Sequence, residues 1–329
     1  MKNIIFKIFM IFCVNIFHAQ GFLWNDEIKN YVDSSFKKVE TTRSFVPSKY
    51  SLERYTPSYV SNQGPTSMCV AYALASCRTI LYAKNKRITN RDEIFNKSFS
   101  PFFIYYLVKD YNDISCSAGL IIYDAIEYLR DNGIPKLLDV EYPNYWPFTE
   151  KVLCDEYPPN IYADARNAQK FKIDSPKMIE TENSNFTAIN RIKSELSSGN
   201  PIFIGMKFPL SLATSHGKDF WSPSSYEKTG DMGHAMVIIG YDNNKYGGAF
   251  QILNSHGVEW GNDGKIWIKY NDLIPYLYFT CSISRKYETF GGNVKDLADI
   301  AIDKEIIQSA SPSFISTESD PPAKDFVDE

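Results

Sequence analysis

Three residues that lie far apart in the sequence, Cys69, His234 and Asn254, have side chains that together suit nucleophilic catalysis by a thiol. Cys69 begins a predicted helix, where unpaired amide groups and the positive end of the helix dipole favour the thiolate. His234 stands at the mouth of a predicted strand, a rigid position for a general base. Asn254 ends the next strand, so it could lie beside His234 and hold the imidazole in one tautomer. Taken singly, a buried or disulfide-bonded cysteine and a hydrogen-bonded histidine are the simpler interpretations.

The elements that must position these residues are predicted as helices first and strands second. Apolar periodicity indicates helices over residues 69–84, 100–110, 121–130 and 189–199, and short strands over 201–208, 235–241, 249–253, 265–270 and 278–283. Residues 21–45 are polar without a strong period and are interpreted as an N-terminal lead-in. This order of elements predicts an α+β fold with two lobes.

The composition excludes several classes of protein. The 329 residues are 44% hydrophobic and include 22 Tyr and 22 Phe, which excludes a disordered chain. A formal net charge of −4 does not indicate the basic surface that binding of nucleic acid requires. Residues 1–20 are typical of a secretory signal peptide, with an uncleaved signal-anchor as the alternative, and no later apolar run could span a membrane. We therefore expect an exported protein, secreted or periplasmic or at the cell surface, with an acidic, partly disordered tail over residues 291–329.

Five cysteines remain if the signal peptide is removed. An odd number in an exported chain implies disulfides together with one free thiol. No Cys or His cluster has the spacing of zinc ligands, so we expect no metal site, including one built from His216, His234 and His256.

Short motifs around the three residues follow one another in a specific order. They are Gln63-Gly64 ahead of Cys69-Val70-Ala71-Tyr72-Ala73, then Gly233-His234-Ala235 before Gly240-Tyr241, then Asn254-Ser255-x-Gly257 with Trp260-Gly261 and Gly264. With these motifs the sequence resembles the papain-like cysteine peptidases over roughly residues 46–285.

The resemblance implies a papain-like domain over residues 46–290, with a helical left lobe (about 56–185) and an antiparallel β-barrel-like right lobe (about 186–290). It implies Cys69 as the nucleophile, His234 as the general base and acid, and Asn254 as the residue that orients the imidazole. Gln63 and the Cys69 backbone amide would form the oxyanion hole. The implied reaction is hydrolysis of peptide bonds in a peptide or protein substrate through a thioester, with no metal or organic cofactor.

For the substrate, the resemblance implies main-chain pairing with the segment that ends at Gly119. Ala118, Gly119 and Gly233 are predicted to wall the subsite for the side chain next but one to the cleaved bond, with Phe208 or Pro209 as further neighbours. Because Gly233 carries no charge, we expect apolar or aromatic side chains there. Residues 21–45 are too few for the family's usual inhibitory propeptide, so we expect a monomer whose thiol is accessible once the signal peptide is removed.

The sequence also departs from the family's pattern. Val70 and His256 stand where the family usually has tryptophan, and Thr66 replaces a half-cystine. His256 could weaken the ion pair of the catalytic residues or compete for a catalytic role. Cys116 would then pair with Cys154, and Cys77 with Cys281, although sequence cannot fix the connectivity. These departures leave an alternative function, a weak or inactive papain-fold protein that binds peptides or a partner, which selective alkylation of Cys69 at mildly acidic pH would distinguish.

Overall fold

The computed structural model describes residues 21–40, 46–140, 168, 171–182, 184–224, 233–290 and 293–296. The predicted signal peptide, Cys154, and the tail beyond residue 296 lie outside the described residues. The chain has two compact units, a large one that ends at Lys286 and a small one that begins at Tyr287. In the described part of the chain, no helix has both the length and the apolar character that crossing a membrane requires.

The predicted helices form close to their expected bounds. They are α2 (Cys69–Asn85), α4 (Pro101–Val108), α5 (Ile122–Asn132) and α7 (Asn185–Ser197). Ser100 caps α4, since its hydroxyl accepts a hydrogen bond from the Phe103 amide, and Pro101 occupies the first turn, where no amide donor is needed. Gly133 ends α5 with a φ of 78°.

Four helices in the described part of the chain were not predicted from the sequence, namely α1, α3 and two helices of four residues each, α8 (Leu210–Ala213) and α9 (Tyr270–Leu273). The first, α1 (Asp26–Ser35), lies in the segment interpreted as a lead-in and buries only Ile28 and Val32, so its apolar stripe is too narrow to give a strong period. The second, α3 (Arg91–Asn96), has only six residues and buries only Ile94.

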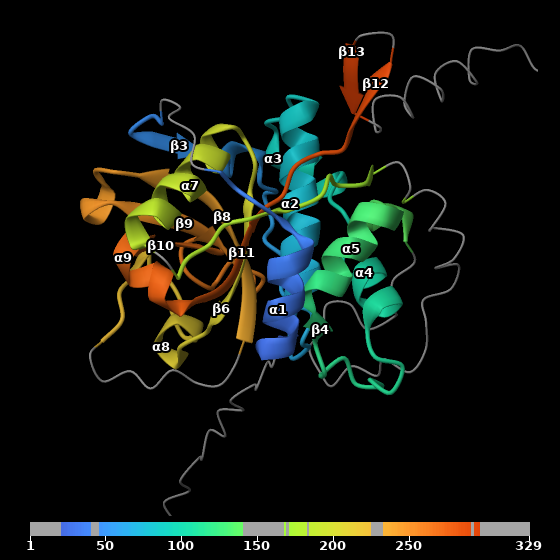
Figure 1. Cartoon of the computed structure of the whole chain (residues 1–329), viewed down its shortest axis with the longest axis horizontal. Helices are drawn as coiled ribbons and strands as arrows, with labels where there is room; N and C mark the ends of the chain where they lie inside the picture. The colour runs from blue at the N-terminus through green and yellow to red at the C-terminus, as the bar shows by residue number, and fades with distance from the viewer. Residues whose placement is uncertain are drawn as a thin grey trace, which may run out of the picture. The chain divides into compact units, whose positions relative to one another are not determined.

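Helix α2 forms the centre of the helical part, and 14 of its 17 residues are buried. It packs against α4 and α5 on one side and against strands β8 (Gly233–Asp242) and β6 (Ile202–Lys207) on the other. Figure 1 shows this arrangement, with α2 between the sheet and the pair α4 and α5. The first residue of α2 is therefore held against the sheet by the packing of the whole helix.

The sheet has nine strands, and β8 lies in the middle of it. The order is β2 (Lys37–Lys38), β5 (Lys177–Met178), β11 (Leu277–Ser282), β6, β8, β9 (Ala249–Leu253), β10 (Lys265–Lys269) and β7 (Phe220–Trp221), while β3 (Lys49–Ser51) also pairs with β8. The central pairs from β5 to β10 are antiparallel, whereas β2 and β7 join their neighbours in parallel.

The prediction of a mixed helix and sheet fold is confirmed, but the expected barrel-like closure is not. The sheet is open, with β2 and β7 as its end strands. Each of these strands has only two residues, too few to form the ladder that would join the two edges.

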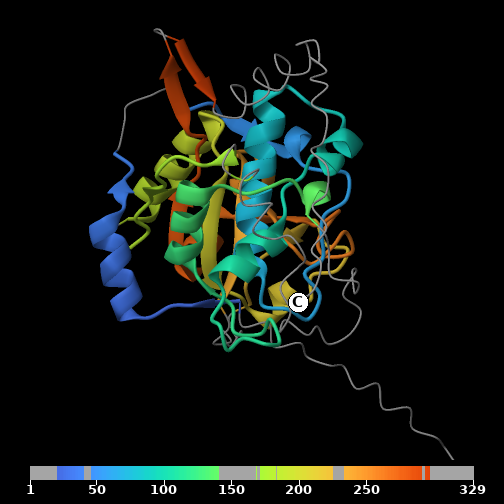
Figure 2. The same ribbon diagram turned by 90° about the vertical axis from the view of Figure 1, so that its right-hand side faces the viewer.

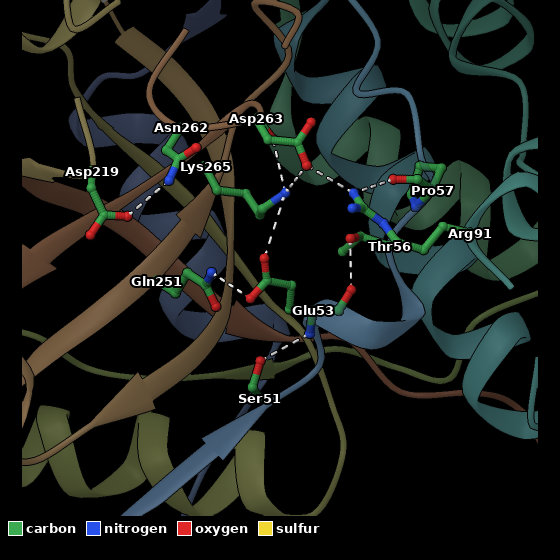
Figure 3. Close-up of polar contacts among 10 residues, drawn as sticks. All are labelled: Ser51, Glu53, Thr56, Pro57, Arg91, Asp219, Gln251, Asn262, Asp263 and Lys265. Carbon is green, nitrogen blue, oxygen red and sulfur yellow. Dashed lines mark hydrogen bonds and ion pairs between the residues drawn. The ribbon is translucent and has the colours of Figure 1, made fainter. Parts of the chain in front are cut away.

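A cluster of charged and polar side chains ties the sheet to the helical part (Figure 3). Lys265 on β10 is 5% exposed and lies 2.7 Å from a carboxylate oxygen of Asp263 and 3.6 Å from one of Glu53. Arg91, the first residue of α3, donates to the same Asp263 oxygen at 3.0 Å. Gln251 on β9 donates to Glu53 at 2.9 Å. Because the charged groups are paired with one another, we interpret the cluster as structural, although Arg91 Nε and Gln251 Oε1 are buried without a hydrogen-bond partner.

The small unit contains strands β12 (Tyr287–Phe290) and β13 (Asn293–Asp296), which pair as an antiparallel hairpin. The hairpin includes the start of the predicted acidic tail over residues 291–329, and the tail beyond Asp296 lies outside the described part of the chain.

Candidate active site

Cys69 is the first residue of α2 and is fully buried. The turn before it is fixed by Ser67, whose amide donates to the Cys116 carbonyl at 2.7 Å and whose hydroxyl donates to Ser117. The Cys69 Sγ accepts a hydrogen bond of 3.3 Å from the backbone amide of Ala235 on β8. The helix start and the central strand therefore meet at the sulfur.

His234 and Asn254 are brought together by neighbouring strands. His234 is the second residue of β8, and Asn254 directly follows β9, whose last residue pairs with Val237. The His234 Nε2 lies 2.7 Å from the Asn254 Oδ1, which also accepts from the Ser255 amide. Because Asn254 Oδ1 accepts both hydrogen bonds, the imidazole proton lies on Nε2, and Nδ1 keeps its lone pair.

Gln63 lies fully buried in the loop before α2. Its Oε1 accepts from the Ser255 hydroxyl at 2.7 Å, and its Nε2 donates to the Thr66 carbonyl at 2.6 Å. The Gln63 amide N–H also donates to the Ser255 carbonyl. These bonds fix the side chain, and the second hydrogen on Nε2 remains as a donor.

The cleft beside Cys69 is occupied by the chain's own residues 21–24. Strand β1 (Phe22–Leu23) pairs in parallel with β4 (Leu120–Ile121), and the Gly21 amide donates to the Gly233 carbonyl at 3.0 Å. A Cβ added to Gly21 would collide with the Cys69 Sγ. Figure 2 shows this segment, in dark blue, running from the foot of α1 toward the lower end of α2. This differs from our expectation of a lead-in that leaves the thiol accessible.

Phe22 is 7% exposed and packs against Gly205 on β6, Gly233 on β8 and Tyr278 on β11. Cβ atoms added to Gly233 and Gly205 would lie only 2.8 Å and 3.3 Å from its ring, and Tyr278 meets it edge-on at 6.3 Å. Gly233 was among the predicted wall residues, whereas Gly205 and Tyr278 were not, because their strands gave no motif.

Of the other predicted subsite residues, Gly119 directly precedes Leu120, the residue of β4 that pairs with Phe22. Gly119 is buried just before β4, with a φ of 78°. Ala118 is exposed, and Pro209 precedes the short helix α8 (Leu210–Ala213). Phe208 instead stacks on the His234 ring at 4.2 Å.

Burial dominates the electrostatics of the two reactive groups. It raises the pKa of the Cys69 thiol from 9.0 to about 12, against the opposing effect of the backbone hydrogen bonds from Ala235, Val70 and Cys69 itself. It lowers the pKa of His234 from 6.5 to about 4, although the bond with Asn254 acts the other way. His234 Nδ1 is buried and has no hydrogen-bond partner. Burial therefore acts against the thiolate that the sequence predicts, and the thiolate stays a prediction.

His256 is half-buried beside the catalytic ring. Its ring centroid is 4.8 Å from that of His234 and 5.5 Å from that of Phe208, and Trp260 lies beyond it at 6.4 Å. Burial lowers its pKa well below the usual range, and His234 and His216 act in the same direction. Because Asn254 Oδ1 binds His234, the geometry selects His234 rather than His256 as the oriented base.

The cysteines depart from the predicted connectivity. Cys77 and Cys281 both carry free thiols, so the predicted pair is wrong. Each is fully buried, and both behave as small apolar side chains in the core. Cys116 is disulfide-bonded, and its predicted partner Cys154 lies outside the described residues, so this pairing stays a prediction. Among the residues that the structure covers, no group of three His, Cys, Asp or Glu side chains is arranged to hold a metal ion.

Comparison with models of known protein families finds a match. A sequence model described as papain family cysteine protease matches residues 106–288, which is more than half of the chain. The match includes His234 and Asn254 but begins after Cys69, so the position of Cys69 comes from the structure. No curated protein matches the chain.

Solved structures share the fold. Xylellain, a cysteine protease from Xylella fastidiosa, aligns with a TM-score of 0.63 and 22% identity over 81% of this chain and 96% of its own. Digestive procathepsin L 3 from the larval midgut of Tenebrio molitor aligns with a TM-score of 0.57 and 12% identity, over 80% and 76% of the two chains. The cysteine protease Amb a 11 of ragweed pollen, in its proform, aligns with a TM-score of 0.54 and 16% identity over 81% and 74%.

Proposed function

Because the chain belongs to the papain family of cysteine proteases, whose substrates are peptides or proteins, we propose that it hydrolyses peptide bonds with Cys69 as the nucleophile and His234 as the general base and acid. One observation carries the proposal. The backbone amide of Ala235, the residue after His234, donates a hydrogen bond to the Cys69 Sγ, and Asn254 Oδ1 binds the Nε2 of the imidazole. Nδ1 is therefore left with its lone pair and without a hydrogen-bond partner among the described residues, so it is the nitrogen that can act as a base.

The reaction follows from this arrangement. Nδ1 takes the proton of the Cys69 thiol, and the thiolate attacks the carbonyl carbon of the substrate peptide bond. The negative charge that develops on the carbonyl oxygen is stabilised by the free Nε2 hydrogen of Gln63 and by the Cys69 amide. The carbon–nitrogen bond breaks as His234 returns its proton to the leaving amine, which leaves a thioester. Water, deprotonated by His234, hydrolyses the thioester and releases the acid and the thiol.

Export, a monomeric state and the absence of a metal or organic cofactor belong to the same proposal. Export rests on the apolar segment of residues 1–20 in the sequence. Independence of a cofactor rests on the site itself, since the thiol, the base and the oxyanion donors needed for acyl transfer all come from the chain.

The test compares the exported protein with a Cys69→Ala variant. We expect hydrolysis of a fluorogenic peptide library by the first and none by the second, together with stoichiometric labelling of Cys69 by an electrophilic peptide. All three described thiols are buried, but Cys69 is covered by the segment that contains Gly21, so it can label when that segment moves away. Cys77 and Cys281 serve as internal controls, because they lie in the core and should label only after unfolding. Peptide binding without turnover, with equally slow labelling of all thiols, would refute the proposal and favour the binding protein.

A further inference from the structure

A buried tyrosine and a buried aspartate lie at the base of the segment that ends at Gly119. Tyr105 is on α4 and Asp113 is in the loop that follows this helix, and the two residues are 0% and 5% exposed. The Tyr105 hydroxyl donates a hydrogen bond of 2.6 Å to Asp113 Oδ2. The ammonium group of Lys109, the residue after α4, donates to the Asp113 carbonyl oxygen at 2.8 Å. Both the side chain and the backbone of Asp113 are therefore tied to the helix.

The second carboxylate oxygen of Asp113 binds the segment itself. Asp113 Oδ1 accepts a hydrogen bond from the Ser117 amide at 3.0 Å and a longer one from the Ser115 amide at 3.4 Å. The Gly119 amide also donates to the Tyr105 hydroxyl. Because a buried carboxylate oxygen or hydroxyl is costly to leave unpaired, these bonds fix the path of residues 115–119 relative to α4.

The same segment holds the turn before the nucleophile. Ser67 donates its amide to the Cys116 carbonyl at 2.7 Å and its hydroxyl to the Ser117 carbonyl at 2.9 Å. Thr66 stands where the family usually has a half-cystine, so no disulfide from that position can fix the turn. Hydrogen bonds to the segment therefore hold Ser67, and the Cys69 amide, one of the two proposed oxyanion donors, follows two residues later.

We propose that Tyr105 and Asp113 are positioning residues of the proposed protease. Through residues 115–119 they hold the Cys69 amide in the oxyanion hole and the Gly119 backbone in place for main-chain pairing with substrate. This inference rests on the proposed function and concerns the same site. Both residues act through the segment and not on the reacting atoms. A displacement of about 1 Å in a positioning group can cost about 100-fold in rate, so a small shift of the segment is enough to impair turnover.

Removal of the Tyr105 hydroxyl tests the proposal, because Tyr105→Phe keeps the ring that fills the core. We expect kcat/KM for peptide hydrolysis to fall by about 10- to 100-fold, with kcat lowered through the oxyanion hole and KM raised through Gly119. Alkylation of Cys69 by iodoacetamide should not fall, because displacement of iodide by the sulfur needs neither an oxyanion donor nor pairing with the segment. Asp113→Asn keeps an oxygen that can accept from the Ser117 amide, so it should impair hydrolysis less than Asp113→Ala does.

Tyr246→Phe is the matched control. It removes a hydroxyl that also donates to an aspartate at 2.6 Å, Asp219, and both residues lie outside the site. It should leave hydrolysis and alkylation unchanged. A second readout does not depend on activity: the Ser67 and Ser117 amides should exchange their hydrogens faster in Tyr105→Phe than in the wild type or the control.

The outcomes separate this proposal from the proposed function. In a wild type that hydrolyses peptides, an unchanged kcat/KM for Tyr105→Phe would overturn the positioning role, and so would an equal fall of hydrolysis and alkylation, which indicates damage to the fold or to the catalytic pair. A wild type without hydrolysis would refute the proposed function. Hydrogen exchange then decides the remaining question, since faster exchange supports the hold of Tyr105 on the segment and unchanged exchange overturns it.

Discussion

Removal of the Asn254 side chain should reduce turnover while leaving substrate binding nearly unchanged. Asn254→Ala deletes the acceptor of the 2.7 Å bond from His234 Nε2, in a place where the two residues are 4% and 1% exposed. The N–H is then buried without a partner, and it belongs to a ring that must carry a positive charge during the reaction. A hydrogen bond to a charged group contributes about 1.5–3 kcal/mol. We therefore expect kcat to fall by about 10- to 150-fold.

The same variant should also change the pH dependence. The bond with Asn254 raises the pKa of His234 against the effect of burial, so its loss lowers that pKa further. The imidazolium then loses its proton at lower pH, and the alkaline limb of kcat/KM should move toward acid. The measurement is a pH profile of peptide hydrolysis by the wild type and by Asn254→Ala.

Asn243→Ala is the matched control, because Asn243 accepts a hydrogen bond from the Tyr270 hydroxyl and has no contact with the imidazole. It should leave the profile unchanged. An Asn254→Ala protein with wild-type kcat and an unshifted alkaline limb would refute the idea that Asn254 orients the ring.

Three further predictions address the surroundings of the site. His256→Trp should stabilise the His234 imidazolium, because an indole ring at the place of His256, 4.8 Å away, attracts a cation better than a second imidazole does. Labelling of Cys69 by an electrophilic peptide at pH 5 should rise about 2- to 5-fold, and a fall would contradict this. Lys265→Met should lower the free energy of unfolding in urea by about 1–3 kcal/mol, since Asp263 and Glu53 lose their common partner, and unchanged stability would contradict the structural interpretation of the cluster in Figure 3. Acidification from pH 6.5 to 4 should lower the stability of the wild type more than that of His234→Gln, because the depressed pKa of His234 makes the unfolded chain take up the proton first; equal slopes would argue against it.

Much of the fold could be predicted because the relevant signals are local. Helix α2 begins at the predicted residue, and the cap at Ser100 and the stop at Gly133 both mark helix ends. The strands that hold His234 and Asn254 are continuous apolar runs, since both faces of the sheet are covered there. Pairing of those strands then brings the two side chains together without any further information.

The lead-in segment could not be interpreted in this way. Strand β1 has two residues, and the decisive contacts of Gly21 are made by its backbone and by the absence of its side chain. A glycine in a polar stretch gives the same pattern whether it lies in solvent or against a catalytic sulfur. Whether the sheet closes could not be predicted from the sequence either, because closure depends on the lengths of β2 and β7 and not on their residue types.

The charge state of the nucleophile shows why position in a helix is not enough to predict reactivity. A group at a helix end gains about 0.3–1 kcal/mol from the dipole, and up to about 2 kcal/mol in favourable sites. For Cys69, burial raises the pKa from 9.0 to about 12 even after the backbone hydrogen bonds have acted against it, which is about 4 kcal/mol in favour of the thiol. While residues 21–24 lie over the sulfur, the effect of burial on the thiol pKa is larger than the effect of the helix dipole. A helix start can therefore favour a thiolate at Cys69 only when water returns to the sulfur, so access to the cleft decides both whether substrate binds and whether the nucleophile is charged.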